Sequence, residues 1–259
     1  MSLPGAYRTE DGVILPAVTT EEMRELDAIA TEETGPNLFQ MMENAGRNLA
    51  GVVLEELQGS DASPSVVVLA GTGCNGGGGI CAARHLANRG LDVTLCVSHP
   101  DRLSGVPAEQ RATYGHSSGA VVDAAYLASL EAEIIIDALI GYSLADAPRS
   151  EVHDMIAWAV DQRARFGARI VSLDLPSGID GSTGEAPGAH ICADTTLALG
   201  LPKSGLHPRG EISPVCAGRL RLGDIGVPSG LYARFGSPAP FRTSFVVDLH
   251  PVGLHAPSP

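Results

Sequence analysis

The residues best suited to chemistry begin with a glycine-rich segment in the first third of the chain. Gly71–Gly79 reads GTGCNGGGG; it follows a short apolar run and leads into a stretch with helical spacing. Glycines let the backbone approach a ligand closely, and the free amides at a helix start attract anions such as phosphate. Six glycines in nine residues exceed what a tight turn requires. We therefore interpret the segment as a ligand-binding loop around Asn75, with an unliganded turn as the alternative.

Two aspartates stand at the ends of apolar runs further along the chain. Asp137 closes the run EIIID, and Asp174 closes RIVSLD shortly before Ser177. In an open parallel sheet the carboxyl ends of the strands share one edge, where ligands collect, so we expect both aspartates near Asn75. Carboxylates there supply oxygen ligands for a cation or a base for proton transfer. The structural alternative is that each aspartate only accepts hydrogen bonds from the turn that follows it.

The same loop contains G-x-G-x-x-G, which on its own is a weak sign of dinucleotide binding. A dehydrogenase site also needs an acidic residue at the end of the second strand. Asp92 falls at a suitable distance but opens that strand, and Val97-Ser98-His99 closes it. The pattern therefore disfavours a standard nicotinamide-dependent dehydrogenase.

The elements that must position these groups alternate between helical and strand-like patterns. Thr19–Leu57 predicts two helices broken near Gly35-Pro36, and further helices are expected over 77–90, 125–130 and 149–165. Strands are expected at 65–71, 91–98, 120–123, 133–139, 168–174, 194–200 and 219–222. This alternation predicts a doubly wound, mostly parallel sheet with helices on both faces. We place that domain at 18–235, between an N-terminal extension (1–17) and a proline-rich C-terminal tail (236–259) that is loose or packed on the surface.

Composition excludes several classes of function. The formal net charge is −13, and a nucleic-acid partner would need a clustered basic face. No basic leader and no apolar run of membrane-spanning length is present, so we expect a cytoplasmic protein without a membrane partner. The five cysteines form no C-x-x-C pair, so we expect them to be reduced and expect no structural zinc.

Seven motifs follow one another in a family order. They are MMENAG (41–46), VVLAGTGCNGGGGI (67–80), AARHL (82–86), DALIGYS (137–143), DLPSGID (174–180), LPKSG (201–205) and LGDIGVP (222–228). Together, from about Val18 to Pro228, they resemble the YjeF N-terminal domain family, whose enzymatic members are NAD(P)HX epimerases.

This resemblance implies a Rossmann-like three-layer αβα sandwich, a homodimer, and the exchange of the R and S forms of a hydrated nicotinamide nucleotide, NAD(P)HX. It places a potassium ion near Asn75, Asp137 and Ser177. It implies that Asp174 is the catalytic acid or base for an exchange through an iminium intermediate. The substrate would contact Asn75, Gly76, Gly77, Gly78, Gly141, Tyr142, Ser143, Asp146 and Asp174.

The loop departs from the family pattern N-N-G-G-D-G at two positions, where Cys74 replaces the first asparagine and Gly78 replaces the aspartate. Each lost polar contact is worth about 1–3 kcal/mol if its partner stays buried and unpaired. Two alternatives to a working epimerase therefore stay open. One is the same scaffold redirected to a cyclase or isomerase reaction on imine or carbinolamine intermediates, and the other is a non-catalytic ligand-binding or scaffolding module.

Two further side chains have two interpretations each. Cys74 is either a thiol whose pKa a helix start lowers or a small residue that fills the loop. Lys203 either meets a phosphate or is solvated.

Overall fold

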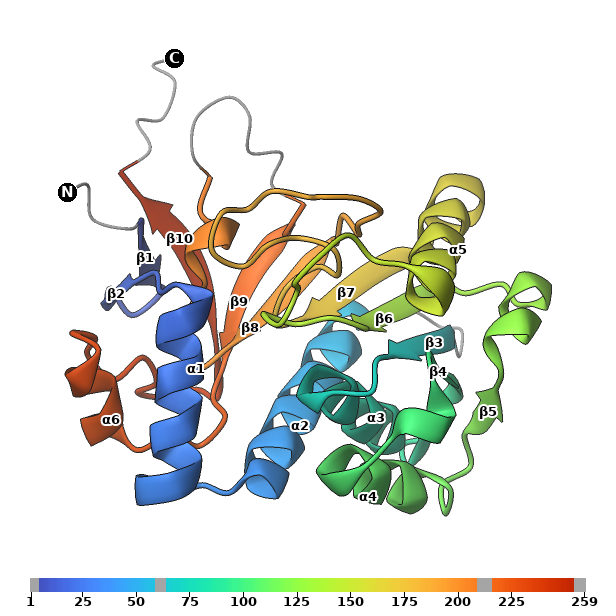
Figure 1. The fold of residues 1–259 in the computed structure, drawn as a ribbon, viewed down its shortest axis with the longest axis horizontal. Helices are drawn as coiled ribbons and strands as arrows, with labels where there is room; N and C mark the ends of the chain where they lie inside the picture. Colours follow the sequence, from blue (N-terminus) through green and yellow to red (C-terminus); the bar gives the residue numbers. More distant parts are fainter. Residues whose placement is uncertain (1–4, 59–63, 209–215, 254–259) are drawn as a thin grey trace.

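The computed structural model describes residues 5–58, 64–208 and 216–253, and a ten-stranded sheet runs through them (Figure 1). The strand order is β2-β1-β10-β9-β8-β7-β6-β3-β4-β5. Neighbours from β9 to β5 are parallel, whereas β10, β1 and β2 pair antiparallel at the other end. The strands are β1 Ala6–Thr9, β2 Ile14–Pro16, β3 Ser65–Ala70, β4 Asp92–Val97, β5 Ala120–Val122, β6 Ile134–Ala138, β7 Arg169–Leu173, β8 Thr195–Leu199, β9 Arg219–Gly223 and β10 Val246–Val252.

The helices largely follow the expected pattern. The first helical segment is divided at the Gly35-Pro36 peptide, and the Thr19 and Asn37 side chains cap the two halves. Helix α4 was not predicted, because the polar Gln110 interrupts its buried face and removes the apolar stripe. The helices are α1 Thr20–Ile29, α2 Leu38–Glu56, α3 Cys74–Ala87, α4 Gly105–Tyr114, α5 Ser150–Phe166 and α6 Ser229–Arg234, with single helical turns at Ala30–Thr34, Pro100–Arg102, Ala124–Ser129 and Ser204–Leu206.

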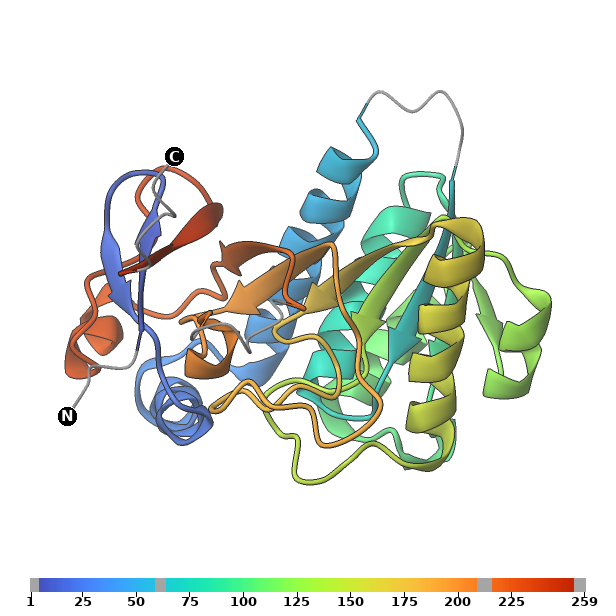
Figure 2. The same ribbon diagram turned by 90° about the horizontal axis from the view of Figure 1, so that it is seen from above.

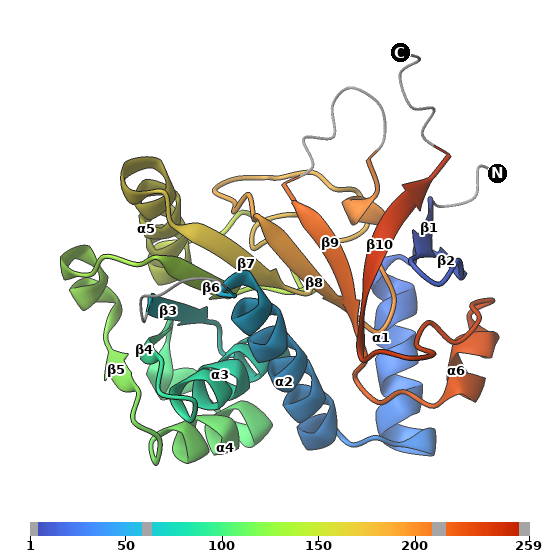
Figure 3. The same ribbon diagram turned by 180° about the vertical axis from the view of Figure 1, so that it is seen from behind.

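The sheet is covered on both faces because its central strands carry apolar residues on both faces. In β3, Val66 and Val68 belong to the core formed with α2 and α3, whereas Val67 and Leu69 belong to the core formed with α5. Figure 2 shows the sheet between these two helical layers, and Figure 3 shows α2, α3 and α4 side by side on one face. This arrangement confirms the predicted three-layer α/β architecture with a mostly parallel sheet.

After β3, the chain adds strands first on one side of β3 and then on the other side. It runs from β3 to β4 and β5 at one edge, and then β6 pairs with the opposite side of β3, followed by β7, β8 and β9. The carboxyl ends of β3 and β6 therefore form the topological switch point, where open α/β sheets bind ligands. The glycine loop follows β3, and Asp137 lies within the last two residues of β6.

Both terminal segments join the same sheet. Strand β10 pairs with β9 on one side and with β1 on the other, so Val246–Val252 is an interior strand. The expectation of a loose or surface-packed tail is wrong for these residues. The segment lacks helical periodicity and contains Pro251. Its Val247 and Leu249 are nevertheless buried against β1, β9 and β2. A local sequence pattern cannot predict this long-range packing. Residues 254–259 of the expected tail lie outside the described residues.

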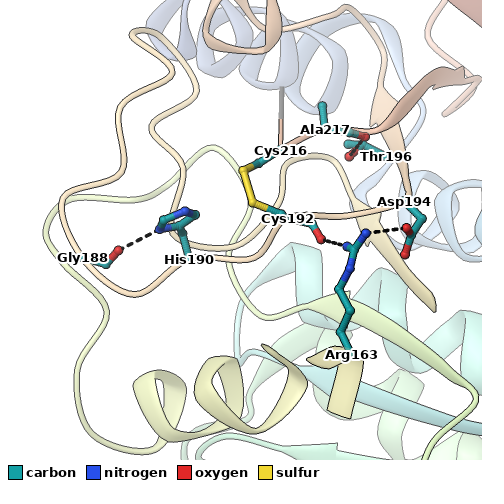
Figure 4. The surroundings of a disulfide bond; sticks show 8 residues. All are labelled: Arg163, Gly188, His190, Cys192, Asp194, Thr196, Cys216 and Ala217. Carbon is teal, nitrogen blue, oxygen red and sulfur yellow. Dashed lines mark hydrogen bonds and ion pairs between the residues drawn. A yellow bond between two sulfur atoms is a disulfide. The ribbon is translucent and has the colours of Figure 1, made fainter. Parts of the chain in front are cut away.

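Two of the five cysteines are bonded to each other, contrary to the expectation of reduced thiols. Cys192, which precedes β8, forms a disulfide with Cys216, which precedes β9 (Figure 4). The expectation rested on sequence spacing, but the two strands are parallel neighbours, so the residues before them lie side by side. Cys74, Cys81 and Cys96 are free. No helix within the described residues is long and apolar enough to cross a membrane.

Candidate active site

A cavity of about 780 Å³ opens at the switch point. It is lined by the segments that follow β3 and β6 and by residues of α1 and α2. This volume lies within the usual range of roughly 300–1,000 Å³ for small-molecule sites. Ser98 and His99, which follow β4, also line it, whereas Asp92 lies at the start of that strand and does not.

The glycines of the loop are required by close packing. None of Gly71–Gly79 has a positive φ, so left-handed backbone does not explain them. A Cβ atom on Gly71 would collide with the carbonyl oxygen of Leu139, and one on Gly76 would collide with the carbonyl oxygen of Gly71. These contacts hold the start of α3 directly against the segment after β6, and α3 begins at Cys74, three residues earlier than predicted.

Asn75 lies in the first turn of α3 and borders the cavity together with Asp174. A Cβ atom on Gly141 would lie 3.2 Å from Asn75 Cγ and 3.1 Å from Asp174 Oδ2. The amide and the carboxylate therefore both lie beside Gly141, as the shared strand edge predicted. Asn75 Nδ2 is buried and has no hydrogen-bond partner among the described residues. An unpaired buried amide is costly, so this atom favours a ligand.

Asp137 is a wholly buried carboxylate surrounded by neutral donors. It accepts hydrogen bonds from Ser177 Oγ (2.5 Å), Ser177 N (2.8 Å), Ser172 Oγ (2.8 Å) and Leu139 N (3.3 Å). Burial raises the pKa of Asp137, and the hydrogen bonds from Ser177 and Ser172 oppose that rise. The hydroxyl of Ser177 also accepts from Ile140 N at 2.9 Å, so Asp137 and Ser177 together fix the turn that carries Gly141.

Asp174 forms a buried ion pair with Lys203. Lys203 Nζ lies 2.5 Å from Asp174 Oδ1, and the two side chains are 0% and 5% exposed. The ammonium also donates to the Leu199 carbonyl at 2.9 Å, and Tyr142 N lies 3.3 Å from Asp174 Oδ2. Asp174 has φ +68°, a left-handed conformation that costs of order 1–3 kcal/mol in a residue other than glycine. Such strain persists where the surroundings dictate it, often at functional sites.

Tyr142 and Asp27 form a second polar pair in the cavity wall. The Tyr142 hydroxyl donates to Asp27 Oδ2 at 2.6 Å, and Asp27 comes from α1. Burial raises the pKa of Asp27, while the Tyr142 hydrogen bond and the charge of Lys203 lower it. Asp27 Oδ1 is buried without a partner among the described residues. The pair therefore presents an unused acceptor at the cavity.

The predicted substrate-contact residues separate into two groups, and the predicted potassium ligands Asp137 and Ser177 do not line the cavity. Asn75, Gly141, Tyr142, Ser143, Asp146 and Asp174 all line the cavity, whereas Gly76, Gly77 and Gly78 are buried in α3 behind its wall. A Cβ atom on Gly77 would meet Met42, and one on Gly78 would lie 2.8 Å from Leu173 Cδ2. These glycines face the core because α3 packs against α2 and the sheet with backbone contacts.

Three cavity residues were missed or misread from sequence. Asp27 and His99 showed no local signal, because α1 and the end of β4 reach the cavity only in the folded chain. Lys203 is neither solvated nor free for a phosphate, since it is fully buried against Asp174. A signal existed: the chain has one lysine beside 16 arginines. For Cys74, partial burial and the charge of Asp27 raise the thiol pKa, which contradicts the interpretation of a lowered pKa and leaves that of a small loop residue.

Comparison with known proteins places the fold. The family profile described as YjeF-related protein N-terminus matches residues 38–205. An NAD(P)H-hydrate epimerase of Dehalogenimonas lykanthroporepellens is 45% identical over 240 residues, which cover 93% of this chain and 94% of that protein. The bifunctional NAD(P)H-hydrate repair enzyme Nnr of Hyperthermus butylicus is 38% identical, and the match covers 82% of this chain but 38% of that longer protein.

The solved structure of yeast ynu0 has the same fold. It superposes with a TM-score of 0.78 at 22% identity, over 90% of this chain and 100% of the yeast chain. The profile match covers more than half of the chain, and the Dehalogenimonas relative is similar over nearly its whole length. The chain therefore belongs to the YjeF N-terminal domain family.

Proposed function

We propose that this protein is an NAD(P)H-hydrate epimerase, an isomerase that interconverts the R and S forms of NAD(P)HX. In this substrate a hydroxyl group sits on the ring carbon next to the nicotinamide nitrogen. Protonation of the hydroxyl lets it leave as water while the nitrogen lone pair forms an iminium. Addition of water to the other face, with loss of one proton, gives the opposite form. One proton and one water are consumed and returned.

Asp174 carries this proposal because its surroundings suit both halves of the reaction. Its carboxyl group borders the cavity, and the Lys203 ammonium 2.5 Å away brings a transferable proton beside it. Donation of that proton would let the hydroxyl leave, and the negative charge that remains would stabilise the iminium. The same carboxylate would take the proton back when water adds. The hydrogen bond from Tyr142 N orients Asp174 Oδ2 beside Gly141.

The remaining cavity residues would hold the nucleotide around Asp174. Asn75, Gly141, Tyr142, Ser143 and Asp146 line the same space. The first turn of α3 has no side-chain cap, so its amides are free to bind a phosphate. Gly76, Gly77 and Gly78 would act through the close packing that positions this helix start, without lining the cavity.

A potassium ion, which the family implies, would be held by Asn75, Asp137 and Ser177. These residues offer hard oxygen donors, and the wholly buried Asp137 has neutral described neighbours, which fits a cation site. Turning the Asn75 amide would present its oxygen in place of the unpartnered nitrogen. When bound, the ion would supply the positive charge that Asp137 lacks. We expect potassium to raise the melting temperature relative to lithium, and to do so less in Ser177→Ala; an equal rise in both would argue against this ligand.

The two departures from the family loop are compatible with epimerase activity for a physical reason. Gly78 faces Leu173 in the core, so in this chain its missing carboxylate takes no contact away from the cavity. Cys74 lines the cavity as a small thiol, and its raised pKa keeps it neutral. The altered loop therefore changes the shape of the entrance more than its charge.

We also propose a homodimer, as the family resemblance implies. Light scattering should then give about twice the chain mass of 26.7 kDa. A single-chain mass at micromolar concentration would remove this proposal and leave the proposed reaction standing.

The deciding experiment follows the R form of the hydrate. Purified protein is mixed with R and S NADHX and a dehydratase that consumes only the S form, in potassium buffer, and recovery of NADH is recorded. We expect fast clearance of the R fraction, with a loss of about 100-fold or more in Asp174→Asn, as for a general acid–base group. Asp154→Asn is the matched control, because that side chain is 79% exposed and does not line the cavity.

The opposite outcome is equally informative. Clearance of the R form at the protein-free rate would reject the epimerase proposal and favour the redirected or non-catalytic alternatives. Circular dichroism of both variants distinguishes lost chemistry from lost folding.

A further inference from the structure

The disulfide has a third soft donor beside it. A ring nitrogen of His190 and the sulfur atoms of Cys192 and Cys216 all lie within 4.8 Å of one another (Figure 4). Cys192 and Cys216 precede the amino ends of β8 and β9, whereas His190 packs against Gly178 in the turn that follows β7. None of them lines the cavity. The cluster therefore lies outside the cavity itself.

Backbone contacts hold the two cysteines together independently of their bond. Ala193 N donates to the Cys216 carbonyl at 2.8 Å, and Arg219 N donates to the Asp194 carbonyl at 2.8 Å. A further backbone bond links Ile191 N to Ser177 O at 2.9 Å. These bonds join the segments on both sides of the disulfide, so reduction leaves the two sulfur atoms facing each other.

The imidazole of His190 is prepared to act as a metal ligand. Its Nδ1 pairs with the Gly188 carbonyl at 3.0 Å, which requires the hydrogen to be on Nδ1. The lone pair of the neutral ring is then on Nε2. A backbone carbonyl that fixes the tautomer in this way is the usual outer partner of a metal-bound histidine.

We propose that the reduced protein binds one Zn²⁺ ion through Cys192, Cys216 and His190, with a fourth position open to water. A dithiol or phosphine reductant first supplies two electrons, and two protons convert the disulfide into two thiols. Zinc then displaces both thiol protons and accepts the Nε2 lone pair, so the two thiolates neutralise its charge. Zinc–sulfur bonds of about 2.3 Å in a tetrahedral site place the sulfur atoms about 3.8 Å apart, a separation that only the reduced form can reach.

The side chain of Arg163 anchors the segment that carries Cys192. The Arg163 guanidinium donates to the backbone carbonyl of Cys192 and pairs with Asp194 at 2.7 Å (Figure 4). In a reducing compartment, where disulfides do not persist, the metal form would be the resting state.

A second cluster of possible metal ligands lies elsewhere in the fold, but its surroundings do not favour a metal ion. Glu43, Cys81 and His85 also lie within 4.8 Å of one another. There, however, Arg84 already binds Glu43 at 2.6 Å and contacts Cys81 Sγ at 3.4 Å. A cation would have to displace this arginine. The described residues around Cys192 and Cys216 place no side-chain cation against the sulfur atoms in this way.

Zinc binding to oxidised and reduced protein tests the proposal. The protein is reduced with a phosphine, dialysed against ZnSO₄, and assayed for bound metal; Co²⁺ in place of zinc reports thiolate ligands through its absorption. We expect one zinc per reduced chain with a Kd below about 1 µM, and affinity at least about 100-fold weaker for the oxidised protein.

Variants assign the ligands. His190→Ala keeps both thiols and the disulfide, so it folds as the parent does, and we expect at least about tenfold weaker binding. The double variant with Cys192→Ser and Cys216→Ser should lose the cobalt–thiolate absorption. Cys74→Ser, a change at an exposed thiol outside the cluster, should retain it. Equal zinc binding in the oxidised and reduced protein, or in the double variant, would overturn the proposal, and so would an unaltered affinity in His190→Ala.

Discussion

Replacing Lys203 with methionine removes the ammonium that pairs with Asp174 while keeping most of the buried stem. Asp174 would then keep only the long contacts from Tyr142 N at 3.3 Å and Leu199 N at 3.4 Å. Because both side chains are buried, 0% and 5% exposed, solvent cannot replace the lost charge. Removing one partner of a buried pair costs about 3–5 kcal/mol. For a chain of this size the melting temperature should fall by roughly 6–20 °C.

Urea unfolding measures this loss through the fluorescence of Trp158, the only tryptophan of the chain. Arg234→Met is the matched control, because its ion pair with Glu33 is 53% and 57% exposed and should be worth about 0–1 kcal/mol. The double change of Lys203→Met with Asp174→Asn leaves a neutral amide whose unmet hydrogen bonds cost about 1–3 kcal/mol, so it should be more stable than Lys203→Met alone. A loss below about 1 kcal/mol in Lys203→Met, or a double variant no more stable, would refute the reasoning.

Three other substitutions should change the stability of the protein in a direction that their contacts define. Tyr142→Phe leaves the buried Asp27 carboxylate without its 2.6 Å donor, and we expect urea titration to show a loss of about 1–3 kcal/mol. Burial raises the pKa of Glu43, but hydrogen bonds from side chains of α3 outweigh it and lower the pKa to about 2 from its ordinary 4.5. The resulting stabilisation is complete above pH 4.5 and lost as the pH falls toward 2, so Glu43→Gln should flatten the decline of the unfolding free energy in that window. Gly79→Ala places a Cβ against β6 and should cost about 1–3 kcal/mol, whereas Gly51→Ala on α2 meets nothing within 4 Å and should gain up to about 1 kcal/mol in thermal unfolding.

The sequence alone was enough for the central part of the fold. Continuous apolar runs such as Ser65–Ala70 are typical of strands buried on both faces. Such a run can be recognised from sequence because the apolar character of each residue does not depend on a distant partner. The position of Asp174 at a strand end also predicted its approach to Asn75, since parallel strands deliver their carboxyl ends to one edge. Family motifs then added expected roles that spacing could not supply.

The tertiary structure decided what depends on contacts between distant segments. Lys203 finds Asp174 only after β8 and the turn that follows it pack beside β7, so its burial has no local signature. The same holds for Cys192 and Cys216, which lie 24 residues apart and meet because β8 and β9 pair in parallel. Strand β10 is likewise fixed by its neighbours on both sides. Local patterns report the period and polarity of a segment, whereas the partner of a buried charge, thiol or strand is set by long-range packing.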